Sequence, residues 1–400
     1  MRRMHNAIIR LKPREDRRLR AGHLWIFSNE IDTDATPLKA FEPGDPVIVE
    51  SASGRPLGVG YVNPRSLISV RLLSADPRQH IDRAFLATRV RAALAWREGL
   101  GIGPYYRLIF GEADGLPGLV VDRYGDALVA QITTAGMDRL LPDILASLED
   151  VVQPASILLR NDTSSRALEG LPRTVEAALG EPPAEAEVSE NGGRFRVSLQ
   201  EGQKTGWFYD QRANRARLAS YVKGKRVLDL FSYAGGFGIQ AALAGAREVL
   251  LVDASQQALA YARSNAATNG VGERVATAQS DVSTFLKGLR EEGRRFDVVI
   301  CDPPALIKRR KDQDEGVGAY QRLNQAALAV VEDGGLLVSA SCSHHLARDQ
   351  LARVVGQAAV RSGRRVQFVE EGGQGPDHPV HPAIVETAYL KVLWTRCIGA

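Results

Sequence analysis

Residues 226–255 read RVLDLFSYAGGFGIQAALAGAREVLLVDAS, and this stretch decides the fold of the C-terminal half of the 400-residue chain. An apolar run ends at a glycine-rich turn, a helical pattern follows, and a second apolar run ends at Asp253. Strands that alternate with helices need crossover connections. The stretch therefore predicts a parallel sheet with helices on both faces.

The same alternation continues to residue 343. Further strands are expected at RVATAQSD (274–281), FDVVICDPP (296–304) and GLLVSASCS (335–343), with helical patterns between them. Sheets of this kind bind ligands beyond the carboxyl ends of their strands. Polar residues at those ends are therefore the first candidates for a functional site.

The N-terminal half has a different pattern. Residues 1–78 predict a small, mostly β barrel, with one short helical piece around RRLRAGHLWIFSNEI. A helix is expected from Arg83 to about Leu100, followed by three strands over 106–132, a helix near 137–150 and a strand near 155–161. The Pro- and Glu-rich stretch 181–195 is the best candidate for a linker or domain edge. We therefore predict domains at 1–78, 79–185 and 186–400.

Composition and charge narrow the class of protein. The formal net charge is +4, and eight of the first twenty residues are Lys or Arg, which favours either a polyanionic partner or a solvated basic face. Three scattered cysteines predict reduced thiols and no metal site. No apolar run approaches the roughly 18–20 residues that span a bilayer, and the start lacks a secretory signal, so a cytoplasmic location is expected.

Four carboxylates lie at the ends of successive predicted strands: Asp229, Asp253, Asp281 and Asp302. A glycine turn followed by an acid suits a dinucleotide or a nucleoside-type cofactor, in which Asp253 would bind both ribose hydroxyls. The turn lacks the G-x-G-x-x-G pattern, Asp281 could face an adenine amino group, and D-P-P resembles motif IV of nucleic-acid methyltransferases. These details favour S-adenosylmethionine. The alternative is that each acid only caps the helix that follows it.

Cys342 follows the last of these strands and lies between two serines. A thiolate there could add to carbon 6 of a pyrimidine and make carbon 5 nucleophilic, while Asp302 holds the edge of the base. The alternative for Cys342 is a small buried hydrophobic residue. Cys301 is expected to pack in the core. His344 and His345 are candidates for a proton shuttle, with a surface or capping role as the alternative.

Together these motifs resemble the RlmI-type 23S ribosomal RNA cytosine-5 methyltransferases. The likeness runs along nearly the whole chain through RRLRAGHLWIFSNEI, FGEADGLPGLVVDRYGD, KTGWFYDQRANR, DVVICDPP, SASCS and DHPV. It implies an α/β protein with an N-terminal PUA domain that docks ribosomal RNA, a central α+β domain and a Rossmann-like class I methyltransferase domain. It further implies that Cys342 is the nucleophile and that KTGWFYDQR covers the donor pocket. The predicted site for S-adenosylmethionine comprises Thr205, Gly206, Asp210, Asp229, Phe231, Tyr233, Gly235, Gly236, Phe237, Asp253, Asp281, Asp302 and Pro303.

The chain departs from this pattern after D-P-P. Many relatives place a lysine and an aromatic residue there, whereas this chain has Ala305 and Leu306, followed by the basic run 308–311. That run is expected either to contact phosphates or to be a solvated loop. Three other functions remain open: an exocyclic-amine methyltransferase that needs no thiol, a non-catalytic RNA-binding or ribosome-assembly protein, and, last, a dehydrogenase. A homodimer is possible, because relatives are often dimers.

Overall fold

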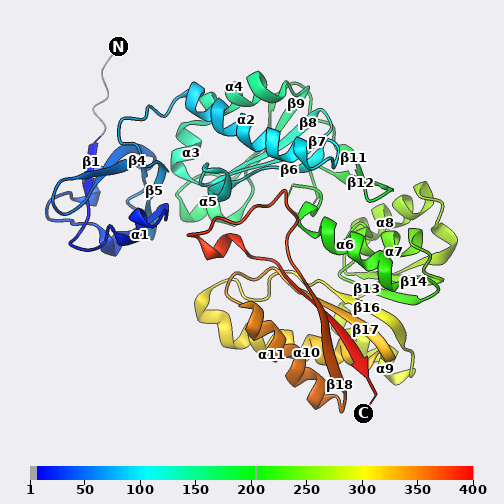
Figure 1. Cartoon of the computed structure of the whole chain (residues 1–400). Coiled ribbons are helices and arrows are strands. Elements are labelled where there is room, and N and C mark those ends of the chain that lie inside the picture. The colour runs from blue at the N-terminus through cyan, green and yellow to red at the C-terminus, as the bar shows by residue number, and fades with distance from the viewer. Residues whose placement is uncertain (1–6, 203–204, 400) are drawn as a thin grey trace. The chain divides into compact units, whose positions relative to one another are not determined.

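The computed structural model describes residues 7–202 and 205–399 (Figure 1). Part of the basic start and Lys204 of KTGWFYDQR lie outside these described residues. The chain divides into two compact units. Unit 1 comprises Met1–Glu185, Ser198–Trp207 and Pro376–Thr387, and unit 2 comprises Ala186–Val197, Phe208–Gly375 and Ala388–Ala400.

The first sheet of unit 1 has five strands in the order β1-β3-β4-β5-β2. Its apolar side chains, such as Val47 and Val70, form a buried core, which confirms the mostly β prediction for this segment. The expected helical piece is only one turn, because Trp25–Phe27 pairs with β5 as a strand. The elements are β1 (Ala7–Arg10), α1 (Arg17–Arg20), β2 (Trp25–Phe27), β3 (Asp45–Glu50), β4 (Pro56–Val62) and β5 (Ile68–Ser74).

The second sheet of unit 1 also has five strands, in the order β10-β9-β8-β7-β6. The predicted helix after residue 82 is present, and the Asp82 side chain caps it by accepting from the Phe85 N–H. Leu86 and Val90 on its inner face pack into the core of this sheet. The elements are α2 (Arg83–Gly99), β6 (Tyr105–Phe110), β7 (Leu119–Tyr124), β8 (Ala127–Ile132), α3 (Ala135–Arg139), α4 (Leu141–Val152), β9 (Ser156–Arg160), α5 (Ser164–Leu168) and β10 (Val175–Leu179).

The candidate linker at 181–195 contains strand β11 (Glu185–Glu190) and the start of β12 (Gly193–Ser198). These two strands pair as a hairpin. The stretch is therefore ordered rather than a structureless connection. The three-domain division at residues 78 and 185 remains a prediction.

Unit 2 contains a seven-stranded sheet with the order β15-β14-β13-β16-β17-β19-β18. The first five of these strands run parallel, as the alternating sequence pattern predicts. The elements are α6 (Arg212–Leu218), β13 (Arg226–Leu230), α7 (Gly236–Leu243), β14 (Glu248–Asp253), α8 (Gln256–Thr268), β15 (Val275–Gln279), α9 (Val282–Glu291), β16 (Phe296–Cys301), α10 (Gln313–Ala329), β17 (Val331–Ser341), α11 (Arg348–Arg361), β18 (Arg365–Gly372) and β19 (Lys391–Ile398).

The end of the chain completes this sheet in a way that the sequence analysis missed. Strand β19 lies beside β17 and runs antiparallel to it, with Lys391 opposite Ser341. Strand β18 then pairs with β19 at the sheet edge. The start of β19 is thereby brought next to the Cys342 segment.

No helix in the described part of the chain is long and apolar enough to cross a membrane.

Candidate functional site

The turn after β13 has an unusual backbone. Phe231 and Tyr233 adopt positive φ angles of 59° and 48°, and Gly235, the N-cap of α7, has φ 84°. Side chains rarely tolerate this region, and such residues gather at functional sites. Gly238 in the first turn of α7 is required for packing, because a Cβ there would lie 2.2 Å from the Leu251 side chain.

The Asp229 carboxylate stabilises this turn by a hydrogen bond from the start of α7. Its carboxylate accepts the Gly238 N–H at 2.9 Å, and the residue is only 1% exposed. Burial raises the pKa of Asp229 to about 8, against the opposing effect of the Gly238 N–H, while Asp302 and Asp253 add to the rise. Among the predicted donor-site residues, Asp229 therefore supports the turn from within the core.

Asp253 ends the neighbouring strand β14 and faces the same turn. One carboxylate oxygen accepts the Tyr233 N–H at 2.9 Å and the other accepts the Ser255 N–H at 2.8 Å. Each oxygen retains a lone pair for a second donor. Asp281, at the next strand end, is exposed and caps α9 by accepting the Thr284 N–H at 3.0 Å. Capping is thus the observed contact of Asp281.

Asp302 follows β16 and is hydrogen-bonded to the second half of KTGWFYDQR. Gln211, in the 3₁₀ helix Tyr209–Gln211, donates from Nε2 to the Asp302 carboxylate at 2.8 Å. Gln211 Oε1 in turn accepts from Asn214 Nδ2 at 2.7 Å. The neighbouring Asp210 is buried and accepts a hydrogen bond from the Tyr389 hydroxyl. The structure therefore brings Asp210 and Asp302 to the same region of unit 2.

Cys342 lies just past the end of β17, the strand beside β16. Its thiol belongs to a half-buried residue, whereas Ser341 and Ser343 on either side are fully buried. Both serine hydroxyls lie 2.9 Å from the Tyr320 hydroxyl. The surroundings of Cys342 are polar, as the flanking serines predict.

Lys391 is one of the residues of this region that the sequence analysis missed. Its ammonium donates to the backbone oxygens of Ser343 at 2.6 Å and Tyr389 at 2.8 Å. Burial lowers the pKa of Lys391 to about 8, with Cys342 opposing the decrease and Arg348 adding to it. Lys391 lies 49 positions after Cys342 in a strand that no local motif marks, so only the antiparallel pairing of β19 with β17 reveals it.

The other candidate cysteines and histidines have ordinary surroundings. Cys301 is 1% exposed inside an apolar cluster, and burial raises the pKa of its thiol, which confirms the packing prediction. Cys397 is also buried there, with its pKa raised to about 11 by burial. The exposed His344 packs its ring 5.6 Å from that of Tyr389. A proton shuttle by His344 or His345 stays a prediction.

The remaining predicted donor residues fall into two groups. Gly236 and Phe237 are buried in the first turn of α7, and Pro303 is buried after Asp302. Thr205 and Gly206 belong to unit 1, where the Thr205 hydroxyl donates to the Asp122 carboxylate. Their role toward the donor therefore stays a prediction.

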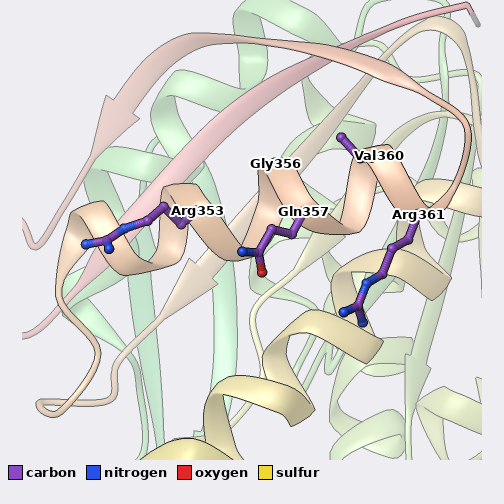
Figure 2. Close-up of a pocket in the computed structure, with 5 residues that line it drawn as sticks. All are labelled: Arg353, Gly356, Gln357, Val360 and Arg361. Atoms are coloured by element: carbon purple, nitrogen blue, oxygen red, sulfur yellow. The ribbon is translucent and has the colours of Figure 1, made fainter.

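Two basic surfaces lie outside these contacts. The run 308–311 is exposed, and its Arg309 pairs with Asp312 at 2.8 Å. A pocket lies along α11, lined by Arg353, Gly356, Gln357, Val360 and Arg361 (Figure 2). The pocket includes none of the predicted site residues.

Comparison with known proteins places this geometry in a family. The S-adenosylmethionine-dependent methyltransferase family matches residues 171–396, and a PUA-like domain matches residues 9–75. The ribosomal RNA large subunit methyltransferase I of Shewanella amazonensis is 38% identical over 97% of this chain and 98% of its own. The protein of the same name from Escherichia coli K12 is 35% identical with the same coverage. The chain belongs to this methyltransferase family.

Two solved structures of low sequence identity share the fold of this chain. A structure from Streptococcus mutans, described as a SAM-dependent methyltransferase, has a TM-score of 0.83 at 20% identity and covers 98% of this chain and all of its own. The SMU.776 structure, in complex with SAH, has a TM-score of 0.84 at the same identity and coverage. These likenesses confirm the α/β methyltransferase fold.

The family uses S-adenosylmethionine, and the glycine turn fits it. The donor carries a ribose with two hydroxyls, and Asp253 has two carboxylate oxygens that each keep an acceptor lone pair. The buried hydroxyl of Ser232, in the same turn, has no hydrogen-bond partner among residues 7–202 and 205–399. The residues present therefore suit a polar ligand held at the end of β13 and β14.

Proposed function

We propose that this methyltransferase makes 5-methylcytosine in the RNA of the large ribosomal subunit, with Cys342 as its nucleophile. The two curated relatives named above are large-subunit ribosomal RNA methyltransferases along their full length. The observation that carries the choice of carbon 5 is the position of Cys342. It is a half-buried thiol in polar surroundings, one strand away from Asp302 of D-P-P.

Carbon 5 of cytosine is a weak nucleophile, and this explains why a thiol is needed. In the proposed reaction the Cys342 thiolate forms a bond to carbon 6, and the π pair of the carbon 5–carbon 6 bond becomes available at carbon 5. S-adenosylmethionine supplies an electrophilic methyl group. Once carbon 5 carries the methyl group and S-adenosylhomocysteine is the leaving group, the carbon 5 proton is lost to water and the double bond reforms. The electron pair of the carbon 6–sulfur bond returns to Cys342.

Asp302 is proposed to hold the pyrimidine edge by a hydrogen bond to the exocyclic amine or to N3. Gln211 supports this role, because its amide fixes one oxygen of the carboxylate at 2.8 Å. A carboxylate held in this way keeps its orientation when the substrate arrives. Donor binding is assigned to the glycine turn, Asp253 and the remaining residues of the predicted site.

The PUA-like segment is proposed to dock the RNA. Exposed basic residues extend from its first strand into α1 and include Lys12, Arg14 and Arg17. Phosphate contacts by such residues position RNA without reading its sequence. Binding by this segment should therefore weaken as salt rises.

The test is mass-spectrometric mapping of modified nucleotides in ribosomal RNA from cells with and without the gene. A cytosine that loses its 5-methyl group without the gene, and regains it with the native gene, supports the proposal. Cells given the Cys342→Ala gene should show a loss of at least about 10³-fold in the rate of that modification. Methylation of an exocyclic amine, retained by Cys342→Ala, would instead establish a thiol-independent reaction.

A further inference from the structure

Lys391 is a buried lysine. Its residue is 5% exposed, and two of its three ammonium hydrogens are used by the backbone oxygens of Ser343 and Tyr389. The third has no hydrogen-bond acceptor within residues 7–202 and 205–399. No carboxylate in that part of the chain pairs with Lys391. A lysine is seldom buried in this way without an anion to balance it.

The group that can supply the anion is Cys342. Lys391 stands opposite Ser341 in the β17–β19 pairing, and its ammonium reaches the carbonyl of Ser343. The two contacts bracket Cys342 on both sides along the chain. Cys342 is also the group whose negative charge favours the protonated form of Lys391, whereas Arg348 opposes that form.

Tyr320 is a further titratable group whose pKa responds to Cys342. Its hydroxyl is held by Ser341 and Ser343, and burial raises its pKa, with a further increase from Cys342. A tyrosine with a raised pKa stays neutral near pH 7. It therefore offers no charge to balance Lys391.

We propose that Lys391 is a positioning residue that keeps Cys342 as a thiolate; this rests on the proposed function. In the proposed pair the proton resides on the Lys391 amine instead of on the Cys342 thiol, so that the two groups are an ammonium and a thiolate. The thiolate then adds to carbon 6 of the pyrimidine. When the carbon 6–sulfur bond later breaks, its electron pair returns to a sulfur that the same ammonium stabilises.

The proton balance of this pair is reasonable. An ordinary cysteine has a pKa near 8.5, and the lowered pKa of Lys391 brings the amine close to that value. In such a pair the proton can reside on the nitrogen at small energetic cost, and the burial of Lys391 strengthens the attraction between the two charges. A solvent-exposed lysine of ordinary pKa is charged near pH 7 without a partner, whereas the buried Lys391 is more easily neutralised and gains from an anion nearby.

The experiment follows the thiolate directly. Ultraviolet thiolate absorbance is titrated against pH, and the curve of a matched Cys342→Ser protein is subtracted to isolate Cys342. We expect the midpoint to rise by about 1 pH unit or more in Lys391→Met and to stay within a few tenths in Lys391→Arg, which keeps the charge. Lys287→Met is the control, since Lys287 is exposed on α9 and changes the net charge equally.

Methylation rates give a second readout. At about pH 7 the rate in Lys391→Met should fall about 10-fold or more and recover as the pH rises, while donor affinity stays unchanged. Donor affinity also reports whether unit 2 is folded. If Lys391→Met does not fold, Lys391→Gln, whose amide can still donate to a backbone oxygen, replaces it in the same titration.

The outcomes separate this inference from the proposed function. An unchanged Cys342 midpoint in a folded Lys391→Met or Lys391→Gln protein overturns the role of Lys391, whatever the activity of Cys342→Ala. Full methylation by Cys342→Ala overturns the proposed function, whereas a shifted midpoint would still establish the thiolate–ammonium pair.

Discussion

Two regions at the carboxyl ends of the parallel strands in unit 2, here called the donor edge and the thiol edge, differ in how far apart their residues lie in the sequence. The donor edge, at the ends of β13 and β14, comes from residues 226–255 and places Asp229 and Asp253 around the glycine turn. The thiol edge, at the ends of β16 and β17, combines side chains near positions 211, 302, 342 and 391. One edge is thus local in sequence, and the other depends on the complete sheet order.

The edges also use buried charge differently. At the donor edge, carboxylates accept backbone N–H groups and thereby fix the shape of a strained turn. At the thiol edge, the buried Lys391 ammonium donates to backbone oxygens, one of them that of Ser343 next to Cys342. We propose that the first arrangement shapes a surface for the donor and that the second favours the thiolate form of Cys342. Variants of each edge should therefore affect different measurements.

The largest effect expected at the donor edge follows replacement of Asp253. Asp253→Asn removes the charge from the acceptor proposed for the ribose hydroxyls, and hydrogen bonds to charged groups contribute about 1.5–3 kcal/mol. Affinity for S-adenosylmethionine, measured by calorimetry, should fall about 10- to 100-fold. The Cys342 thiolate titration should not move. An unchanged affinity would remove Asp253 from the donor site.

Asp281 provides the matched comparison. Asp281→Ser keeps a good helix cap but removes the longer carboxylate. If Asp281 also accepts a hydrogen bond from the neutral adenine amine, affinity should fall only a few-fold, because such bonds contribute about 1 kcal/mol. No change in affinity would leave Asp281 with its capping role alone.

The fold was largely predictable because its signals are local. Apolar runs that end at Leu230, Asp253 and Cys301 each became a parallel strand, and the helical patterns between them became helices. Periodicity of this kind is set by the burial of one face, which the sequence states directly. Strand β2 was predicted wrongly as helix, because its pairing with β5 overrides the local pattern.

The site was predictable only where its residues carry a motif. The glycine turn, D-P-P and the Ser-Cys-Ser segment stand out in the sequence, and the structure places all three in unit 2. Lys391 and Tyr389 carry no such mark. Lys391 reaches the Ser343 carbonyl next to Cys342, and Tyr389 reaches Asp210, because β19 lies antiparallel beside β17. Strand order is a long-range property that no short pattern encodes.

A smaller effect is expected from the buried acid of the donor edge. The pKa of Asp229 is raised to about 8 in the folded chain, above its ordinary value near 3.9, so its stabilising contribution is complete at low pH and is lost as pH rises toward 8. The free energy of unfolding of the native protein, minus that of Asp229→Asn, should therefore fall by about 1 kcal/mol per pH unit between about pH 5 and about pH 7. Urea denaturation without donor measures it. A difference that does not vary with pH would mean that Asp229 is ionised in the folded protein.

The smallest expected effect is on stability, and it distinguishes Cys301, at the end of β16, from Cys342, just after β17. Cys301→Ala removes one sulfur from an apolar cluster, which should lower the free energy of unfolding by about 1 kcal/mol and leave methylation unchanged. The polar surroundings of Cys342 and the apolar surroundings of Cys301 are the reason for this contrast. Urea denaturation and a methylation assay on the same preparation test both parts. If Cys301→Ala abolished methylation at full stability, the nucleophile would have to be assigned to β16 instead of to the segment after β17.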